Sequence, residues 1–377
     1  MKLSALVLVI ACLQAAAPAQ DLDASINNLG SLDFATRSAA SRNIRRAPAA
    51  QAVPALLEAA ATHKDGFTRF RALVLLTGFN DPRAGGLMLQ LLGDPNDRVR
   101  AVAYGWFEHH RHPEAAKTML AALDNEASEF VRPSLTRALA ADGSTSAREA
   151  MTALVTRGQD FFRSVVIEAL GDYKAAYAAA AIAEVAKLDG PLQDDAALAL
   201  GKIGDRAYLT TLAEVQRTAP RERQPAIAAA ICLLGVNCDA HERYLAEALT
   251  FAIANPDYQP LLRGAAGGLA ALAVAGRQSA LQTLVDAGLP SRDPARAAIA
   301  LALGTVAMRN TPLLLEWIAA REDREPIAAL LAESFDMLEE DLDEERFYVT
   351  VRRSYWQAAE DSPIRAAAEV LIKTLEF

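Results

Sequence analysis

The apolar and polar positions of this chain follow a helical period almost from end to end. In the stretch from Asp194 to Leu212, small apolar residues form one narrow stripe at helical spacing: Ala196, Ala197, Leu200 and Ile203. Gly204 then stands where a left-handed backbone closes a helix, with Gly201 just before it, and Asp205 is placed to cap the next helix. The stretch therefore predicts a helix, a tight turn and a second helix.

The same pattern recurs about ten times between Asn27 and Phe377. Most copies carry an arginine at one position of the helix, where the stretch above has Gln193. These arginines are Arg37, Arg71, Arg100, Arg132, Arg163, Arg263, Arg296 and Arg365. We call these arginines, together with Gln193, the markers. Most neighbouring markers lie 29 to 34 residues apart. The two longer steps are about twice that, as expected if each contains a degenerate unit. This spacing is typical of a solenoid built from helix pairs.

One helix pair cannot bury its apolar stripe alone, but stacked pairs cover one another. We therefore predict an all-α fold, a right-handed α-solenoid of about ten stacked helix pairs in one continuous superhelix. The expected divisions are a signal peptide at 1–19, an N-terminal cap at 20–33, the repeats at 34–326, and a C-terminal repeat and cap at 327–377. The aromatic residues of the last segment fit a cap or, alternatively, a docking surface: Phe347, Tyr348, Tyr355 and Trp356.

The N-terminal segment is typical of a secretory signal peptide. Lys2 precedes an apolar run, and Ala17-Pro18-Ala19 is a small-residue cleavage site. We expect export to the periplasm or the medium. The alternative is processing as a lipoprotein, since Val9 to Cys12 resembles a lipobox, and Cys12 would then hold the protein at the envelope by a lipid anchor.

Composition narrows the choice of partners. The net charge is −9, and an acidic surface repels phosphate backbones, so we expect no nucleic acid. Beyond the N-terminus, no run reaches the roughly 18 apolar residues of a transmembrane segment. The mature chain keeps Cys232 and Cys238, which either form a disulfide in an oxidising compartment or are two buried thiols.

Two stretches carry the repeat pattern most clearly, DRVRAVA at Asp97–Ala103 and ALALGKIGD at Ala197–Asp205. The pattern resembles the HEAT-like repeats of the phycobilisome lyase type over essentially the whole mature chain. This resemblance implies a helix-pair solenoid. It implies no single activity, because similar repeats serve as lyase subunits, hydroxylases, chaperones and scaffolds. Bilin lyases act in the cytoplasm of phototrophs, a setting that the predicted export contradicts.

The strongest candidate for chemistry is a histidine cluster. His109, His110 and His112 are candidate metal ligands, although neighbours in sequence point to different sides and the run also fits a solvated helix end before Pro113. The repeated arginines are expected to bond to turn carboxylates and terminal carbonyls of their own or adjacent repeats. No catalytic motif is present, so we expect no enzyme activity and no cofactor.

The function that we infer from these patterns is a non-catalytic exported scaffold that binds a protein or peptide on its concave face. If the arginine-bearing helices line that face, certain positions point into the groove or lie near its edge: Phe70, Leu73, Leu76, Phe130, Arg137, Phe161, Glu168, Asp194 and Asp195. The alternatives are a metal-binding or lyase-type enzyme on the same scaffold, or an envelope lipoprotein with a structural role.

Overall fold

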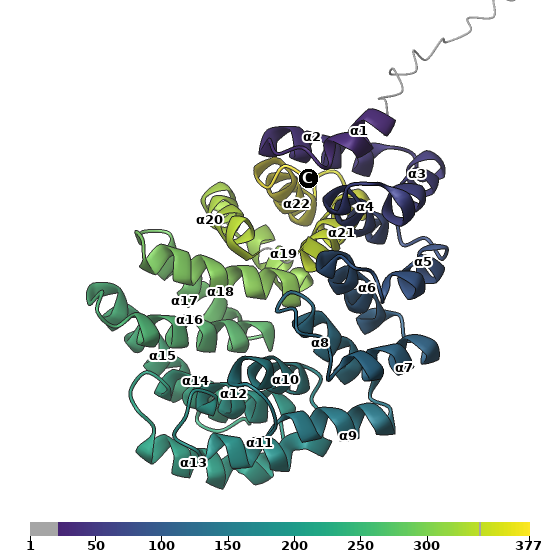
Figure 1. The fold of residues 1–377 in the computed structure, drawn as a ribbon. Helices are drawn as coiled ribbons and strands as arrows, with labels where there is room; N and C mark the ends of the chain where they lie inside the picture. The colour runs from purple at the N-terminus through teal and green to yellow at the C-terminus, as the bar shows by residue number, and fades with distance from the viewer. Residues whose placement is uncertain (1–21, 339–340) are drawn as a thin grey trace, which may run out of the picture.

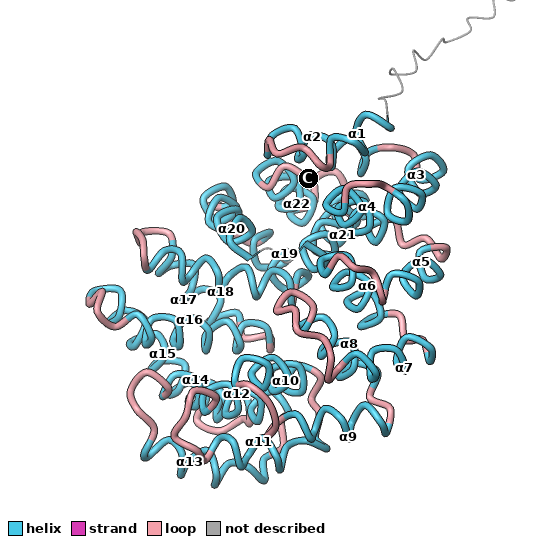
Figure 2. The backbone as a smooth tube through the Cα atoms, in the orientation of Figure 1, coloured by secondary structure: helices cyan, strands magenta, loops and turns pink. Residues whose placement is uncertain are grey.

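The computed structural model describes residues 22–338 and 341–377, and all regular structure in these ranges is helical (Figures 1 and 2). The predicted all-α solenoid is confirmed. The signal peptide expected at 1–19 and the alternative anchor at Cys12 lie outside the described residues. The described part of the N-terminal cap begins with a short helix, α1 (Leu22–Asn28).

The helices form two concentric rows, and the even-numbered helices form the inner row (Figure 1). The inner helices are α2 (Phe34–Arg46), α4 (Gly66–Gly78), α6 (Asp97–His109), α8 (Arg132–Asp142), α10 (Asp160–Asp172), α12 (Gln193–Ile203), α14 (Gln224–Leu233), α16 (Gln259–Val274), α18 (Ala295–Arg309) and α20 (Arg324–Leu338). From α4 onward, each inner helix packs closely against the next, which makes this row the concave side of the stack.

The outer helices contact one another far less, as expected for the convex side of a curved stack. They are α3 (Ala49–Thr62), α5 (Ala84–Leu91), α7 (Pro113–Ala122), α9 (Thr145–Leu154), α11 (Ala179–Ala186), α13 (Leu209–Thr218), α15 (Cys238–Ala254) and α17 (Gln278–Gly288). Short 3-10 helices precede α11 at Ala176–Ala178 and α13 at Arg206–Tyr208. The chain ends with α19 (Thr311–Ala319), α21 (Asp341–Gln357) and α22 (Pro363–Thr374).

The turn after α12 has the predicted chemistry. Gly204 closes the helix with φ of +85°, a conformation that residues with a Cβ rarely adopt. The Asp205 side chain then accepts a hydrogen bond from the backbone N–H of Ala207. Gly201 serves a different purpose, because a Cβ there would lie 2.5 Å from the Cα of Ala230 on α14. A glycine at this position therefore lets two inner helices pack backbone to backbone.

Five of the eight repeated arginines have the structural role expected of them: Arg37, Arg100, Arg132, Arg163 and Arg296. Arg100 donates to the backbone carbonyl of Asp94 at 2.7 Å and also pairs with Glu126 of the next repeat. Arg163 donates to the carbonyl of Val155 at 3.0 Å. Each side chain satisfies a carbonyl in or before the turn that precedes its helix, and so fixes the angle between consecutive helices.

The two degenerate units are present as complete helix pairs. In the first, Gln224 takes the arginine's role and donates to the carbonyls of Gln216 and Ala219 at 2.7 and 2.8 Å. In the second, Arg324 donates to the carbonyl of Ala319 at 2.7 Å. The long step before Arg263 therefore reflects replacement of the arginine by Gln224, and the long step after Arg296 reflects an arginine, Arg324, at a shifted position. Both steps contain a repeat.

The core is extended along the stack. One cluster of buried apolar side chains runs from Ile26 to Leu234, and a second runs from Ala229 to Phe377. Consecutive repeats share each cluster, as nearest-neighbour stacking requires. Beyond these contacts between neighbouring repeats, α21 packs against α4, near the other end of the stack.

The C-terminal helices return to the start of the chain and close the arc (Figure 1). The helix α21 packs against α4, and α22 packs against α19 and α20. Near the C-terminus, Glu376 pairs with Arg42 of α2 at 2.7 Å. The segment predicted to cap the last repeat thus also covers the inner side of the first repeats.

No single helix among the described residues has both the length and the apolar composition to span a membrane. The pair α18 and α19 meets both criteria only jointly, and the two helices are bent by 109° relative to each other. Their apolar residues belong to the core, where Leu303 and Leu314 are both buried.

Candidate functional site: a cavity on the inner face

A cavity of about 400 Å³ lies on the inner face between the two halves of the closed arc. We call it the groove cavity. Its N-terminal wall comes from α4, α6 and α8, and its opposite wall comes from α18, α20 and α21. The residues that line it are Phe70, Arg98, Ala101, Val102, Gly105, Glu108, Glu129, Phe130, Pro133, Ser134, Arg137, Arg309, Met337, Leu338, Leu342 and Asp343.

Exposed apolar side chains border the groove cavity on both sides. Phe130, just before α8, is 55% exposed, and Met337 on α20 is 40% exposed. The Arg98 guanidinium carbon lies 4.7 Å from the centre of the Phe130 ring and 5.7 Å from that of the buried Phe70. This arrangement presents an aromatic face that is held in place by a cation.

The polar side of the cavity belongs to a chain of alternating charges on successive inner helices. Arg137 of α8 donates to Glu108 of α6 at 2.8 Å and to Asp172 of α10 at 2.6 Å. Lys202 of α12 then donates to the other oxygen of Asp172 at 2.7 Å. The Tyr173 hydroxyl donates to Glu108 at 2.5 Å. One charged side chain from each of four repeats therefore links these repeats in series.

Burial and pairing act in opposite directions on these groups. Burial opposes ionisation of Asp172, but Lys202 and Arg137 together hold the pKa of its carboxyl below the ordinary 3.8. Burial and the neighbouring Glu108 raise the pKa of Tyr173, so its hydroxyl stays protonated and continues to donate. Asp172 is therefore ionised and Tyr173 is protonated at neutral pH.

The opposite wall has its own ion pair. Arg309 of α18 donates to Asp343 of α21 at 2.9 Å, and Arg346 donates to the other oxygen of Asp343 at 3.2 Å. This pairing ties α21 to α18, and it sets a second polar edge across the cavity from Arg137. A ligand that binds here meets apolar surface between two polar edges.

Three of the residues expected in the groove lie together in this cavity: Phe70, Phe130 and Arg137. The expectation for Leu73 and Leu76 is wrong, because both are 0% exposed. Five consecutive residues from Ala72 to Leu76 are buried, so α4 is covered on every side. The face of α4 that meets α21 carries Gly78, and Leu73 and Leu76 lie on the opposite face, in the core that α4 shares with its partner helix α3.

The other predicted groove residues lie outside the cavity lining. Glu168 of α10 is exposed, and it raises the pKa of the half-buried Asp195, as Asp194 also does. Burial is the largest cause of that shift, which brings the pKa of Asp195 to about 6, while a 2.6 Å hydrogen bond from Ser164 opposes it. Phe161 is exposed beside Phe162, with the ring centres 5.5 Å apart.

The three candidate metal ligands do not converge. The His110 ring stacks on Trp106 with the centroids 3.6 Å apart, whereas His109 lies 3.7 Å from Glu108 and His112 lies near Phe107. Among the residues that the structure describes, no group of three or more His, Cys, Asp or Glu side chains is placed to hold a metal ion.

The two cysteines are bonded to each other. Cys232, in the last turn of α14, forms a disulfide with Cys238 at the start of α15, and their Cα atoms are 4.3 Å apart. Of the two alternatives that the sequence left open, the structure has the disulfide.

Sequence reasoning missed the C-terminal wall of the groove cavity. Met337, Arg309 and Asp343 stand at no repeated position, and the contact of α21 with α4 leaves no periodic signal in the chain. One local signal was available on the other wall, where Arg98 follows Phe70 by about one repeat and precedes Phe130 by another.

Similarity to a known family supports the repeat assignment in the first half of the chain. A family model for HEAT repeats matches residues 22–105 and 86–171. A search of curated proteins gives no match. Among solved structures, YibA of Escherichia coli has 14% identity and a TM-score of 0.41, and the alignment covers 57% of this chain and 81% of YibA.

Two other solved structures are similar at the same level. The CpcE–CpcF complex of phycocyanin lyase from Nostoc has 20% identity and a TM-score of 0.35, over 60% of this chain and 92% of the matched chain. Yeast importin-beta (Kap95p) has 13% identity and a TM-score of 0.40 over 95% of this chain, which spans 57% of the importin chain.

Proposed function

Because the chain is a HEAT-like repeat protein, we propose that it is a non-catalytic scaffold that binds a segment of a partner protein in the groove cavity. The observation that carries this proposal is the pair Phe130 and Met337. Both are exposed apolar side chains, and they stand on opposite walls of one cavity. An apolar side chain of the partner inserted between them would be covered from two sides.

The surroundings of this apolar pair favour a peptide segment. Arg98 and Arg137 are side chains of the type that dominates binding energy at protein interfaces, and Phe130 supplies a rigid aromatic face. Glu129 and Asp343 add acceptors for backbone N–H groups at the polar edges. We therefore infer a partner segment with one apolar anchor residue flanked by groups of both charges.

We further propose that the protein works outside the cytoplasm. The support for this is the predicted signal peptide at 1–19 and the disulfide between Cys232 and Cys238, a bond that persists in oxidising compartments. Mass spectrometry of the mature N-terminus tests this proposal. Gln20 as first residue supports cleavage after Ala19, a lipid-modified Cys12 supports the anchored alternative, and an intact Met1 contradicts export.

A cross-linking experiment tests the binding site. A photoreactive amino acid at position 130 is expected to capture a partner segment in cells that make the protein, and mass spectrometry identifies that segment. Position 188 is the matched control, because Leu188 is an equally exposed apolar residue after the outer helix α11. Capture of the same proteins at both positions would contradict a groove site.

The identified segment is then synthesised and titrated against purified variants. Phe130→Ala is expected to weaken its binding by about 30-fold, since a central aromatic anchor contributes about 2 kcal/mol or more. Leu188→Ala is expected to leave binding unchanged. Equal affinity for the wild type and for Phe130→Ala would show that the groove cavity is not the binding site.

A further inference from the structure

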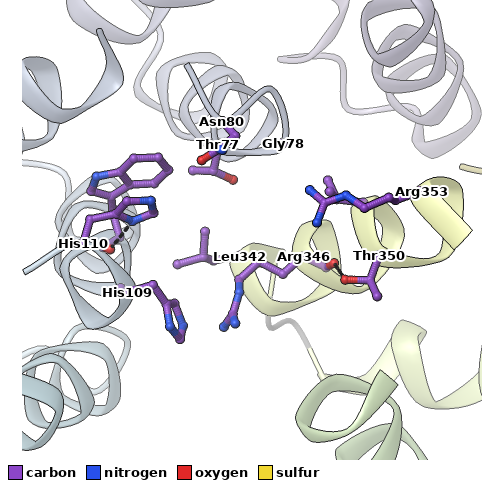
Figure 3. Close-up of a pocket in the computed structure, with 12 residues that line it drawn as sticks. Thr77, Gly78, Asn80, His109, His110, Leu342, Arg346, Thr350 and Arg353 are labelled. Carbon is purple, nitrogen blue, oxygen red and sulfur yellow. Dashed lines mark hydrogen bonds between the residues drawn. The ribbon is translucent and has the colours of Figure 1, made fainter. Parts of the chain in front are cut away.

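A second, smaller cavity of about 230 Å³ lies where α21 crosses the ends of α4 and α6 (Figure 3). We call it the closure pocket. One wall is a single face of α21, formed by residues at helical spacing: Leu342, Arg346, Val349, Thr350 and Arg353. The other wall comprises Thr77, Gly78, Asn80, Gly105, Trp106, His109 and His110. The pocket exists only because the ends of the arc meet.

Its lining is cationic in a chain that is acidic overall. The described lining residues include two arginines but no carboxylate, whereas the whole chain has a net charge of −9. The carboxylates of Glu108 and Asp343 lie next to this lining, at His109 and Arg346. Figure 3 shows the guanidinium groups of Arg346 and Arg353 extending from α21 into the space that faces α4 and α6. Both side chains thus line the pocket with N–H donors, Arg346 beside His109 and Arg353 on the side of α4.

These donors are only partly used within the protein. Arg346 shares Asp343 with Arg309, at a distance of 3.2 Å. Among the described residues, no side chain or carbonyl accepts a hydrogen bond from Arg353, which is exposed. The pocket therefore contains one guanidinium without an acceptor and a second whose acceptor is shared.

Positive charge at this place also has a structural cause. The helices α4 and α6 end at the pocket, and a cation near a helix C-terminus is stabilised by the helix dipole. That effect explains why arginine is tolerated here. The ends of the two helices supply no hydrogen-bond acceptor, however, because neither Arg346 nor Arg353 donates to a carbonyl of α4 or α6 in the described part of the chain.

One part of the remaining lining is apolar and flat, beside the polar side chains of Thr77, Asn80 and Thr350. Trp106 and His110 are stacked with an angle of 4° between their rings, and His110 is held by a 2.9 Å hydrogen bond between its Nδ1 and the Trp106 carbonyl (Figure 3). Leu342 and Val349 face this pair from α21. A ligand that satisfies the arginines must therefore also bring an apolar group.

We propose that the closure pocket binds a small organic anion, either a phosphate monoester or a carboxylate, whose apolar group packs between Trp106 and Leu342. Arg346 and Arg353 hold the anionic oxygens by charge-assisted hydrogen bonds. The volume lies below the range of about 300–1,000 Å³ found for drug-sized ligands, so the ligand is a small molecule. Since it contacts both α6 and α21, it also stabilises the closed arc.

Isothermal titration of the full chain tests this proposal with phenyl phosphate, benzoate, inorganic phosphate and phenol. We expect phenyl phosphate or benzoate to bind at one site, and the stronger of the two identifies the anion class. Inorganic phosphate and phenol are each expected to bind at least ten-fold more weakly, because each lacks half of the recognised features. Hydrogen exchange in α21 is expected to slow when the ligand binds.

Substitutions of the two lining arginines test whether the ligand binds in the closure pocket. Arg353→Gln and Arg346→Gln are each expected to weaken binding about ten-fold. Arg243→Gln, on the outer helix α15, is the matched control and is expected to bind as the wild type does. Arg353→Gln removes no hydrogen bond or ion pair between described residues, so circular dichroism is expected to show a native fold.

The proposal is overturned if neither phenyl phosphate nor benzoate binds saturably to the wild type. It is also overturned if both arginine variants retain wild-type affinity. Binding that survives Phe130→Ala supports a pocket separate from the groove cavity, so the failure of one proposal leaves the other open to its own test.

Discussion

Glu345 on α21 accepts two hydrogen bonds from the guanidinium of Arg45 on α2, at 2.6 and 2.8 Å, across 300 residues of sequence. The carboxylate is 1% exposed, and it also accepts from Arg352 at 3.3 Å. A Cβ on Gly78 of α4 would collide with this carboxylate, so a glycine makes room for it. The buried ion pair therefore joins the two ends of the solenoid.

Replacement of Glu345 by alanine is expected to open the arc. Arg45 would lose its carboxylate partner while still buried, and removal of one member of a buried pair costs about 3–5 kcal/mol. Urea denaturation is expected to show this loss, and small-angle scattering is expected to show a larger radius of gyration. Glu360→Ala, at an exposed position after α21, is the matched control. An unchanged radius in the Glu345 variant would mean that apolar contacts alone hold α21 in place.

Close packing of the inner row predicts opposite effects for two glycines. Gly201→Ala places a Cβ against the backbone of Ala230, and we expect a loss of about 1–3 kcal/mol in the free energy of unfolding. Gly267 lies inside α16 with no atom within 4 Å of an added Cβ, so Gly267→Ala is expected to gain about 0.5–1 kcal/mol from helix propensity. Denaturant midpoints measure both, and a stabilised Gly201 variant would contradict the packing argument.

The charge chain predicts a strong coupling between Arg137 and Glu108. Arg137→Met is expected to cost about 3–5 kcal/mol, because it leaves Glu108 buried without its cation. The double variant Arg137→Met with Glu108→Gln is expected to recover much of that loss, and a double-mutant cycle measures the coupling. The exposed pair Arg157 and Asp124 is the control, and Arg157→Ala is expected to cost less than about 1 kcal/mol. Additive effects at Arg137 and Glu108 would contradict the coupling.

Asp195 predicts an effect that depends on pH. Burial raises its pKa from 3.8 to about 6, so between these values the folded protein binds more protons than the unfolded chain. Stability therefore falls as the pH rises through this window, at up to about 1.4 kcal/mol per pH unit. Asp195→Asn is expected to be more stable than the wild type by roughly 1–3 kcal/mol at pH 7.5 and equal to it below pH 3.8.

Urea unfolding at the two pH values measures this difference. Glu247→Gln, at an exposed position on α15, is the control and is expected to show no such change. If Asp195→Asn changes the free energy of unfolding equally at both pH values, the cost of burying the Asp195 charge is not the cause of the change.

The sequence by itself determined the local units and their stacking. The local signals are an apolar stripe at helical spacing, a turn such as the left-handed one at Gly204, and a side chain such as Arg163 before the buried face. Signals of this kind recur from unit to unit. Repetition strengthens such a signal, because each copy must solve the same packing problem. Two of the positions that the sequence singled out, Phe130 and Arg137, line the groove cavity.

Only the tertiary structure decided what closes the arc. Arg45 and Glu345 stand at no repeated position, and nothing in the spacing of charges says that they meet. The same contact creates the C-terminal wall of the groove cavity as well as the closure pocket. A periodic pattern records how each repeat packs on its neighbour. The meeting of the first and last repeats depends on the accumulated curvature of the whole stack, which no single repeat encodes.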